Sequence, residues 1–197
     1  PRVRAADLPA HEQAAHAAGL ADYRVHSANA DAGSDRFPLA FMRRIGDAAV
    51  VARLGVPRGT DVADDAVAMK AMQQAARESR AILAGPLGWS KSRAEEDQVW
   101  ALVVPVFHGA VPAAADERWA AASGFMLEAF NAMDTAGSAL GPDAKLIGLK
   151  VRDGEVPVFT CPEMKAELAR GFQPTLQRTA NIQFGQRQWT LQFVALP

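Results

Sequence analysis

The sequence predicts an α+β protein with antiparallel sheets. Helical and extended segments follow one another without the regular strand–helix–strand rhythm that produces a parallel sheet. Two uninterrupted apolar runs, at residues 99–107 and 124–130, are short and rich in β-branched and aromatic residues, which is typical of strands. The pair Asp153-Gly154 lies between two extended stretches and predicts a hairpin turn. Two antiparallel sheets in succession are the simplest arrangement of these segments.

Two helices are predicted in the first half. Residues 7–18 are rich in alanine, with Asp7 as the expected N-cap and Gly19 as the expected C-cap. Residues 61–80 are expected to form an amphipathic helix that Thr60 or Asp61 caps. Its apolar residues recur at intervals of four, three, three and four: Val62, Ala66, Met69, Met72 and Ala76.

The remaining segments are mostly extended. Residues 162–172 form either a helix or a loop, and a short helix is expected through Met133. The runs at 99–107 and 124–130 are expected to be buried on both faces, so neither should form a solvent-facing edge of a sheet. The expected strands are residues 23–26, 37–45, 48–54, 82–87, 99–107, 124–130, 144–152, 156–160, 180–184 and 188–196.

Composition excludes several classes of protein. The chain has 197 residues, of which 49% are apolar, so it can bury a sizeable core as one large or two small domains. Its 21 basic and 22 acidic side chains nearly cancel without forming a basic stripe, so no nucleic-acid partner is expected. The longest apolar run is far shorter than the roughly 20 residues that cross a bilayer.

No catalytic residue, metal site or cofactor is predicted. The single cysteine, Cys161, excludes an internal disulfide and a multi-thiolate metal site, and no histidine lies near it in sequence to activate it. His11 and His16 are five residues apart on the first helix, which is not the spacing of a helical metal-ligand pair. We therefore expect recognition and not catalysis.

Seven landmarks follow one another along the chain, from residue 1 to residue 193. They are Pro1-Arg2-Val3 before a helix containing acids and histidines, Phe37-Pro38, Leu54-Gly55 before the helix DDAVAMKAM, ILAGPL, VVPVF, Arg118 before GFM, and the closing FGQRQWTLQF. In this order they resemble the CHASE domain, the extracellular or periplasmic sensory module of membrane histidine kinases, adenylate cyclases and diguanylate cyclases.

The resemblance implies two consecutive PAS-like units, preceded by a long N-terminal helix that is absent from this chain. Residues 1–118 would form a membrane-distal, ligand-binding unit and residues 119–197 a membrane-proximal unit. The implied receptor is a homodimer that pairs through the missing helix. It is tethered to the membrane, and this domain lies on the periplasmic or extracellular face of the inner membrane.

A PAS-like unit holds its ligand between the sheet and the helices that cover it. The expected ligand is a small molecule that no motif identifies. The candidate ligand-binding residues are the inward-facing side chains of the central strands and of the second helix, with glycine and tryptophan at the rim. They are Phe41, Arg53, Leu54, Met69, Leu83, Gly85, Trp89, Ala101 and Val103.

These residues also have simpler interpretations. The apolar members of the set are also the residue types that fill an ordinary packed core. Arg53 either holds a ligand carboxylate or faces solvent on an alternating strand. Trp89 is either a lid that stacks on a ligand ring or a residue packed on the surface.

Two functional hypotheses follow from the sequence. The first is a ligand-binding sensory domain of a transmembrane receptor that transmits to a cytoplasmic kinase or cyclase, with no enzymatic activity of its own. The second is a structural or dimerisation module without ligand, or a stand-alone soluble enzyme. The interior of the first unit discriminates between them, because a sensor needs a cavity whereas a structural module fills it with side chains.

Overall fold

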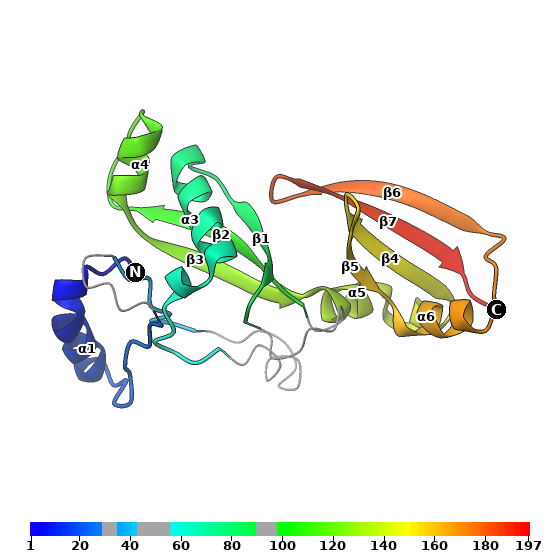
Figure 1. Cartoon of the computed structure of the whole chain (residues 1–197), viewed down its shortest axis with the longest axis horizontal. Coiled ribbons are helices and arrows are strands. Elements are labelled where there is room, and N and C mark those ends of the chain that lie inside the picture. The colour runs from blue at the N-terminus through cyan, green and yellow to red at the C-terminus, as the bar shows by residue number, and fades with distance from the viewer. Residues whose placement is uncertain (29–34, 43–55, 90–97) are drawn as a thin grey trace.

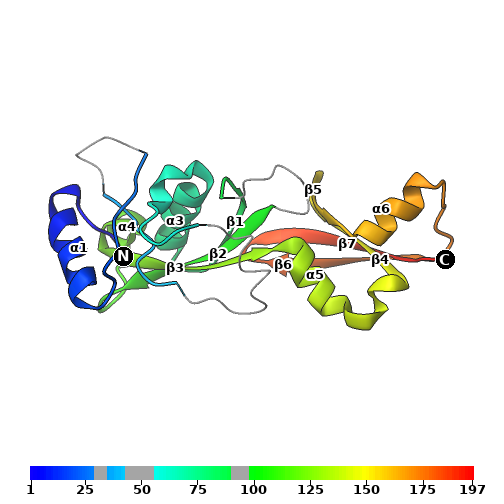
Figure 2. The ribbon, with the colours of Figure 1, turned by 90° about the horizontal axis from the view of Figure 1, so that it is seen from below.

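The computed structural model describes residues 1–28, 35–42, 56–89 and 98–197. Its strands form two antiparallel sheets, one of three strands in the order β1-β2-β3 and one of four in the order β5-β4-β7-β6. The sheets follow one another along the long axis of the molecule, which is visible from two directions (Figures 1 and 2). The predicted α+β fold with two antiparallel sheets is therefore confirmed.

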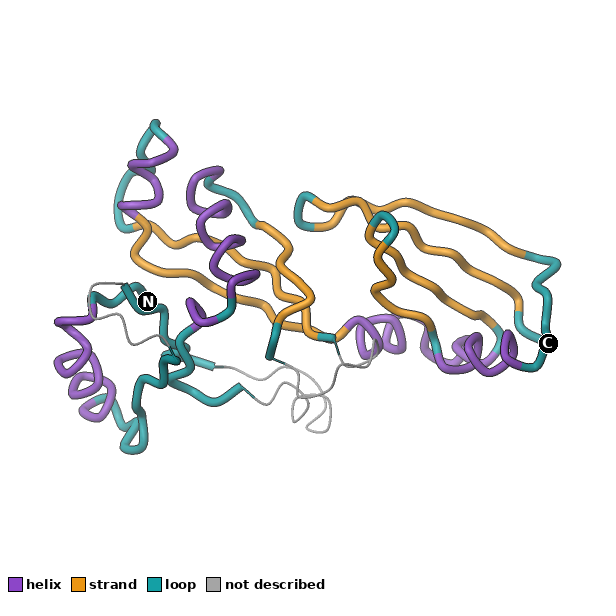
Figure 3. The backbone as a smooth tube through the Cα atoms, in the orientation of Figure 1, coloured by secondary structure: helices purple, strands orange, loops and turns teal. Residues whose placement is uncertain are grey.

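Most elements lie where local sequence signals place them, as the backbone trace shows (Figure 3). The strands are β1 (Ile82–Leu87), β2 (Val99–Phe107), β3 (Ala122–Asn131), β4 (Ile147–Asp153), β5 (Val156–Thr160), β6 (Gln177–Phe184) and β7 (Arg187–Ala195). The helices are α1 (Leu8–Ala17), α3 (Ala66–Glu78), α4 (Ala115–Ala121), α5 (Ala132–Leu140) and α6 (Pro162–Ala169), with 3-10 turns η1 (Ala5–Asp7), η2 (Val62–Asp64) and η4 (Gly141–Lys145).

Helix α3 covers one face of the first sheet, which we call the front face. Its small and apolar side chains recur at helical spacing, so they form one stripe that packs on strands β1 and β2. The first core consists of Phe37, Val62, Ala68, Ala71, Met72, Ala75, Ile82, Ala84, Leu87, Val99, Ala101 and Val103. Each of these side chains is buried, so the helix and the sheet form two layers packed on one core.

Three aspartates at the start of α3 tie separate segments together. The Asp61 carboxylate accepts hydrogen bonds from the backbone of Phe37 (2.8 Å) and Ala63 (3.1 Å). Asp64 accepts from the Ser27 hydroxyl and the Ala28 backbone. Asp65 caps α3 and also accepts from Gly88, directly after β1. We call residues 61–65 the acidic turn; it joins the N-terminal segment, the helix and the first sheet.

Helix α1 is held against the following segment by its two histidines. Both contact Tyr23, which is buried: His11 Nε2 lies 3.0 Å from the tyrosine hydroxyl and His16 Nε2 lies 2.8 Å from its carbonyl oxygen. Glu12 accepts a hydrogen bond from the Val25 backbone. The two histidines therefore hold α1 against the segment that contains Tyr23.

The second sheet has its own core, which extends into the first sheet. Helices α5 and α6 cover it, and Val158 and Phe159 are almost completely buried. Trp100 of β2 and Trp189 of β7 belong to the same cluster, with ring centroids 5.3 Å apart in an edge-on arrangement. The two sheets thus share buried aromatic contacts.

Three expectations need correction. Strand β3 pairs with β2 along its whole length, so the first sheet extends past the predicted division between residues 118 and 119. The charged stretch before it, where no helix was predicted, forms helix α4, which packs against α3. Strand β3 is an edge strand whose Met126 is 61% exposed, although the apolar run predicted burial on both faces.

Other expected elements are present only in part. Around residues 23–26 the structure has an isolated bridge between His26 and Thr60 in place of a strand. Much of the expected strands at 37–45 and 48–54 lies outside the described residues. The segment 162–172, interpreted as helix or loop, contains α6, and the Asp153-Gly154 turn joins β4 to β5 as predicted.

Replacing Asp61 with alanine should strongly destabilise the fold. The side chain is 1% exposed, and its Oδ2 lies 3.7 Å from the buried Arg36 guanidinium. The variant removes the Asp61 carboxylate from beside this buried charge and leaves the Phe37 amide without its acceptor, which costs about 3–5 kcal/mol. Urea unfolding should show this loss, whereas Asp116→Ala, an exposed carboxylate on α4, should leave the midpoint nearly unchanged. Equal midpoints for the two variants would contradict the assignment.

The docking of α1 should weaken in acid. Burial, together with the positive charge of the chain N-terminus, lowers the pKa of His11 below its ordinary value of 6.5, against the opposing effect of Glu12. The folded state disfavours the protonated His11 ring. The contribution of the neutral ring to stability is therefore present above pH 6.5 and is lost as the pH falls through the folded-state pKa of His11. An NMR titration of His11 should give a lower pKa in buffer than in urea; an equal or higher value would contradict the argument.

Candidate functional site

The predicted ligand-binding residues separate onto different parts of the molecule. Arg53 and Leu54 lie outside the described residues. The other seven divide between the front face, the opposite face of the first sheet and the surface. Met69, Trp89, Ala101 and Val103 belong to or pack against the first core, Leu83 and Gly85 lie on the opposite face, and Phe41 is 87% exposed.

The interior between α3 and the front face is filled by side chains. Ala101 and Val103 are 0% exposed, and so are Met72 and Ala75 on the facing helix. Short alanine side chains on the helix let its backbone approach the strands closely. Among the described residues, this layer therefore leaves no space for a ligand directly over the middle of the sheet.

The rim at the end of β1 is more open than the interior. Trp89 and Met69 each pack on the first core while remaining partly exposed. Asp65 fixes the backbone here, because its Oδ2 accepts a hydrogen bond of 2.7 Å from Gly88, next to Trp89. Trp89 and Met69, unlike the fully buried Ala101 and Val103, thus reach the surface near this end of β1. We call these segments the β1 rim (residues 65–69 and 87–89).

Leu83 and Gly85 face the second sheet because side chains alternate along a strand. The Leu83 amide donates to the carbonyl of Gly185 in the β6–β7 turn at 2.9 Å. Arg187 donates from Nη1 to the Gly85 carbonyl at 3.0 Å, and its guanidinium lies 5.3 Å from the Trp100 ring centroid. These contacts make Leu83 and Gly85 part of the contact between the two sheets.

The β6–β7 turn fits this place closely. Gly185 has φ +53°, and a Cβ added to it would lie 2.6 Å from the Leu83 Cβ. Gly85 has a similar restriction, since an added Cβ would lie 2.5 Å from the Trp100 ring. Gly185 is therefore needed for the close approach of the turn to strand β1, and Gly85 leaves room for the Trp100 ring.

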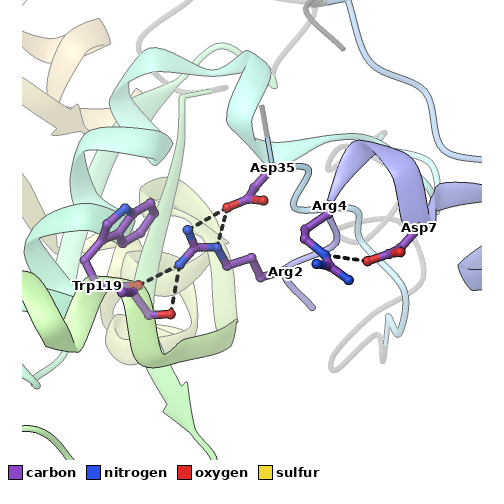
Figure 4. A network of polar contacts seen from close by, with 6 residues as sticks. Arg2, Arg4, Asp7, Asp35 and Trp119 are labelled. Carbon is purple, nitrogen blue, oxygen red and sulfur yellow. Dashed lines mark hydrogen bonds and ion pairs between the residues drawn. The ribbon is translucent and has the colours of Figure 1, made fainter. Parts of the chain in front are cut away.

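A network of polar contacts around Arg2 is structural. Its guanidinium donates to Asp35 Oδ2 at 2.6 Å and to the Trp119 carbonyl at 2.7 Å, and it stacks 4.9 Å from the Trp119 ring centroid (Figure 4). The Arg2 amide also donates to the Ser123 carbonyl at the start of β3. These partners occupy the guanidinium, so it fastens the N-terminal segment to the first sheet.

The described part of the chain gives no sign of a metal centre. It contains no group of three histidine, cysteine, aspartate or glutamate side chains placed to hold a metal ion. Cys161 is buried, and its Sγ accepts a hydrogen bond from the Leu149 amide at 3.2 Å. A surface depression of about 380 Å³ over the outer side of α3 is lined by Lys70, Gln73, Gln74, Arg77 and Glu78, which are polar and mostly exposed.

Sequence reasoning missed two residues that organise this region. Asp65 lies in the acidic stretch before α3, so its position at a helix start was a usable signal. Arg187 follows the turn at Gly185 in a strand that already contained a tryptophan, and nothing local distinguishes it from an exposed arginine. Its role depends on a contact with residues about a hundred positions earlier in the chain.

The comparisons with known proteins agree with the sequence resemblance. The family model described as the CHASE domain matches residues 1–159. A comparison with curated proteins finds no match. Within the described residues, every helix is too short or too polar to cross a bilayer. Because the family match covers most of the chain, including the first sheet and strands β4 and β5, this chain belongs to the CHASE domain family of extracellular sensory domains.

Proposed function

We propose that this chain is the ligand-sensing, extracytoplasmic part of a transmembrane receptor, with a histidine kinase or a diguanylate cyclase as its cytoplasmic output. The observation that carries the proposal is the family match over residues 1–159, because CHASE domains are sensory and not catalytic. The two antiparallel sheets with covering helices are compatible with two PAS-like units in tandem. The receptor would then hold this domain on the outer side of the membrane.

The ligand site of this proposal is the β1 rim. Trp89 and Met69 are its described apolar walls, because each contacts the core on one side and remains partly exposed on the other. An indole and a thioether suit a small molecule with a flat or apolar part. Asp65 supports the rim by fixing Gly88 and the first turn of α3, so it positions the walls without needing to touch the ligand.

Strand β1 is the route by which occupancy would reach the second sheet. Ala84 and Leu87 face the first core, while Leu83 and Gly85 contact the β6–β7 turn. A ligand that shifts the end of β1 at Trp89 would also move the backbone that holds Gly185 and Arg187. Such coupling requires a ligand that binds one arrangement more tightly, typically by about 1–3 kcal/mol.

A second function, a structural module without ligand, is favoured by the closed interior. Ala101 and Val103 have no exposed surface and belong to the same core as Met72 and Ala75 of α3, which are equally buried. A module that only connects or spaces other domains would be packed in this way. The two functions differ in whether the β1 rim binds a metabolite.

A thermal-shift screen of purines, amino acids and organic acids tests the proposed sensor. A compound present at about 100 times its Kd should raise the unfolding midpoint by roughly 5–10 °C for a chain of this size. Trp89→Ala should weaken binding of that compound about tenfold or more, because truncating a central aromatic contact removes much of the binding energy. Affinities are then measured by calorimetry on each folded variant.

Met126→Ala is the matched control for this experiment. Met126 is 61% exposed on the opposite face of the same sheet, so its loss should leave the affinity unchanged. Equal affinities for the Trp89→Ala variant and the wild type would exclude the β1 rim. If no compound raises the midpoint, the structural module is favoured.

A further inference from the structure

Strand β6 is an edge strand with an unusually open backbone. All eight of its residues pair with β7 in continuous register, without a bulge and without a proline. Seven of the eight are exposed, and the strand forms the outer border of the second sheet (Figure 1). The unpaired amide and carbonyl groups of such a strand readily pair with another strand.

Each of the other three sheet edges of the described chain carries at least one feature that limits edge pairing. Strand β1 donates from Leu83 to the β6–β7 turn, and β3 is covered at its start by the Arg2 backbone. Strand β5 has five residues, contains Pro157 and has a register shift against β4. Proline, bulges and covering segments are the usual means by which proteins block edge pairing. Only β6, among these edges, carries none of them.

The side chains of β6 alternate in a way that suits an identical strand. One face carries uncharged polar residues and the other is mainly apolar. The polar face consists of Gln177, Thr179, Asn181 and Gln183, and the other face consists of Arg178, Ala180, Ile182 and Phe184. In an antiparallel pair related by a two-fold axis, opposite residues share a face, so polar meets polar and apolar meets apolar.

Charge does not oppose this pairing. Arg178 is the only charged residue of the strand. With the two-fold axis at Ala180, Arg178 lies opposite Ile182 of the second copy, and with the axis at Asn181 it lies opposite Phe184. In both registers the two arginines are not directly opposed, so the like-charge penalty of a cross-strand pair is avoided.

The polar face of β6 already forms a ladder that a further strand can continue. The Thr190 hydroxyl donates to Asn181 Oδ1 at 3.0 Å, and Gln192 Nε2 donates to Gln177 Oε1 at 3.0 Å. Asn181 and Thr190 are directly opposite in the register of β6 and β7, and Gln177 and Gln192 are diagonal neighbours on the same face. Amide and hydroxyl side chains of this kind donate and accept, so they suit a second identical row.

We propose that β6 pairs antiparallel with β6 of a second copy of this chain, joining two four-stranded sheets into one continuous sheet. This surface differs from the one that the sequence resemblance implies, which is a long N-terminal helix. A contact limited to one eight-residue strand is smaller than the roughly 800 Å² per partner of a stable interface. The dimer of the isolated chain should therefore depend on concentration.

A cysteine scan tests the pairing and its geometry. Thr179, Ala180, Asn181, Ile182 and Gln183 are replaced by cysteine one at a time, oxidised, and analysed for dimers on non-reducing gels. Antiparallel pairing about a two-fold axis brings a residue opposite its own copy only at the axis, so one position, Ala180 or Asn181, should dominate. Cys161 stays unchanged because it is only 4% exposed. Val156→Cys on the β5 edge is the control.

Two results would overturn the proposal. One is cross-linking of equal extent at all five positions, which indicates parallel or unspecific contact. The other is cross-linking no greater than that of the Val156→Cys control, which indicates that the β6 edge stays free.

Sedimentation gives a second, independent readout. The wild-type mass should rise from monomer toward dimer with concentration, and Ile182→Lys should raise the dissociation constant about tenfold or more, since it places a charge on the edge. Ile182 is 42% exposed, so the variant should fold, which circular dichroism checks. Val156→Lys, at a 51% exposed site on β5, should leave association unchanged. A wild-type chain that stays monomeric at all concentrations, or equal effects of both lysines, contradicts the proposal.

Discussion

Strands β1 and β2 place alternate side chains into two different cores, and the rest of the molecule is arranged around that alternation. Ala84 and Ala101 face helix α3, whereas Leu83 and Trp100 face the second sheet. Because neighbouring positions of a strand point to opposite faces, neither core can repack without moving backbone that also serves the other. The first sheet is thus a shared wall between the two halves of the chain.

The fold was predictable where the signals are local. The helical spacing that includes Met69 and Met72, the apolar run of β2 and the Asp153-Gly154 turn all lie in the elements that they predicted. Helix α4 was missed because its charged sequence has no apolar stripe, and it is packed against α3. The place of β3 at an edge follows from long-range pairing with β2, which composition does not encode, and the predicted division at residue 118 was wrong for the same reason.

The candidate site was predictable only as a region. Leu83 and Ala101 are both apolar and buried, so residue type alone does not indicate which of the two cores each one joins. Phe41 was assigned inward on its apolar character, whereas its side chain is 87% exposed. The sequence left open whether Trp89 is a lid over a ligand or a residue packed on the surface. Its partly buried position at the β1 rim makes it the central residue of the proposed ligand site.

Strand β7 gives the contact between the sheets a mechanical consequence. Arg187, at its beginning, touches Gly85 and Trp100, and the strand continues without a bulge through nine residues to Ala195. From Trp189 to Val194 it is paired on both sides, with β4 and β6. At about 3.3 Å per residue, it spans roughly 30 Å. A paired strand resists stretching and bending. A small displacement of one end of β7 is therefore transmitted to the other end with little deformation of the intervening backbone.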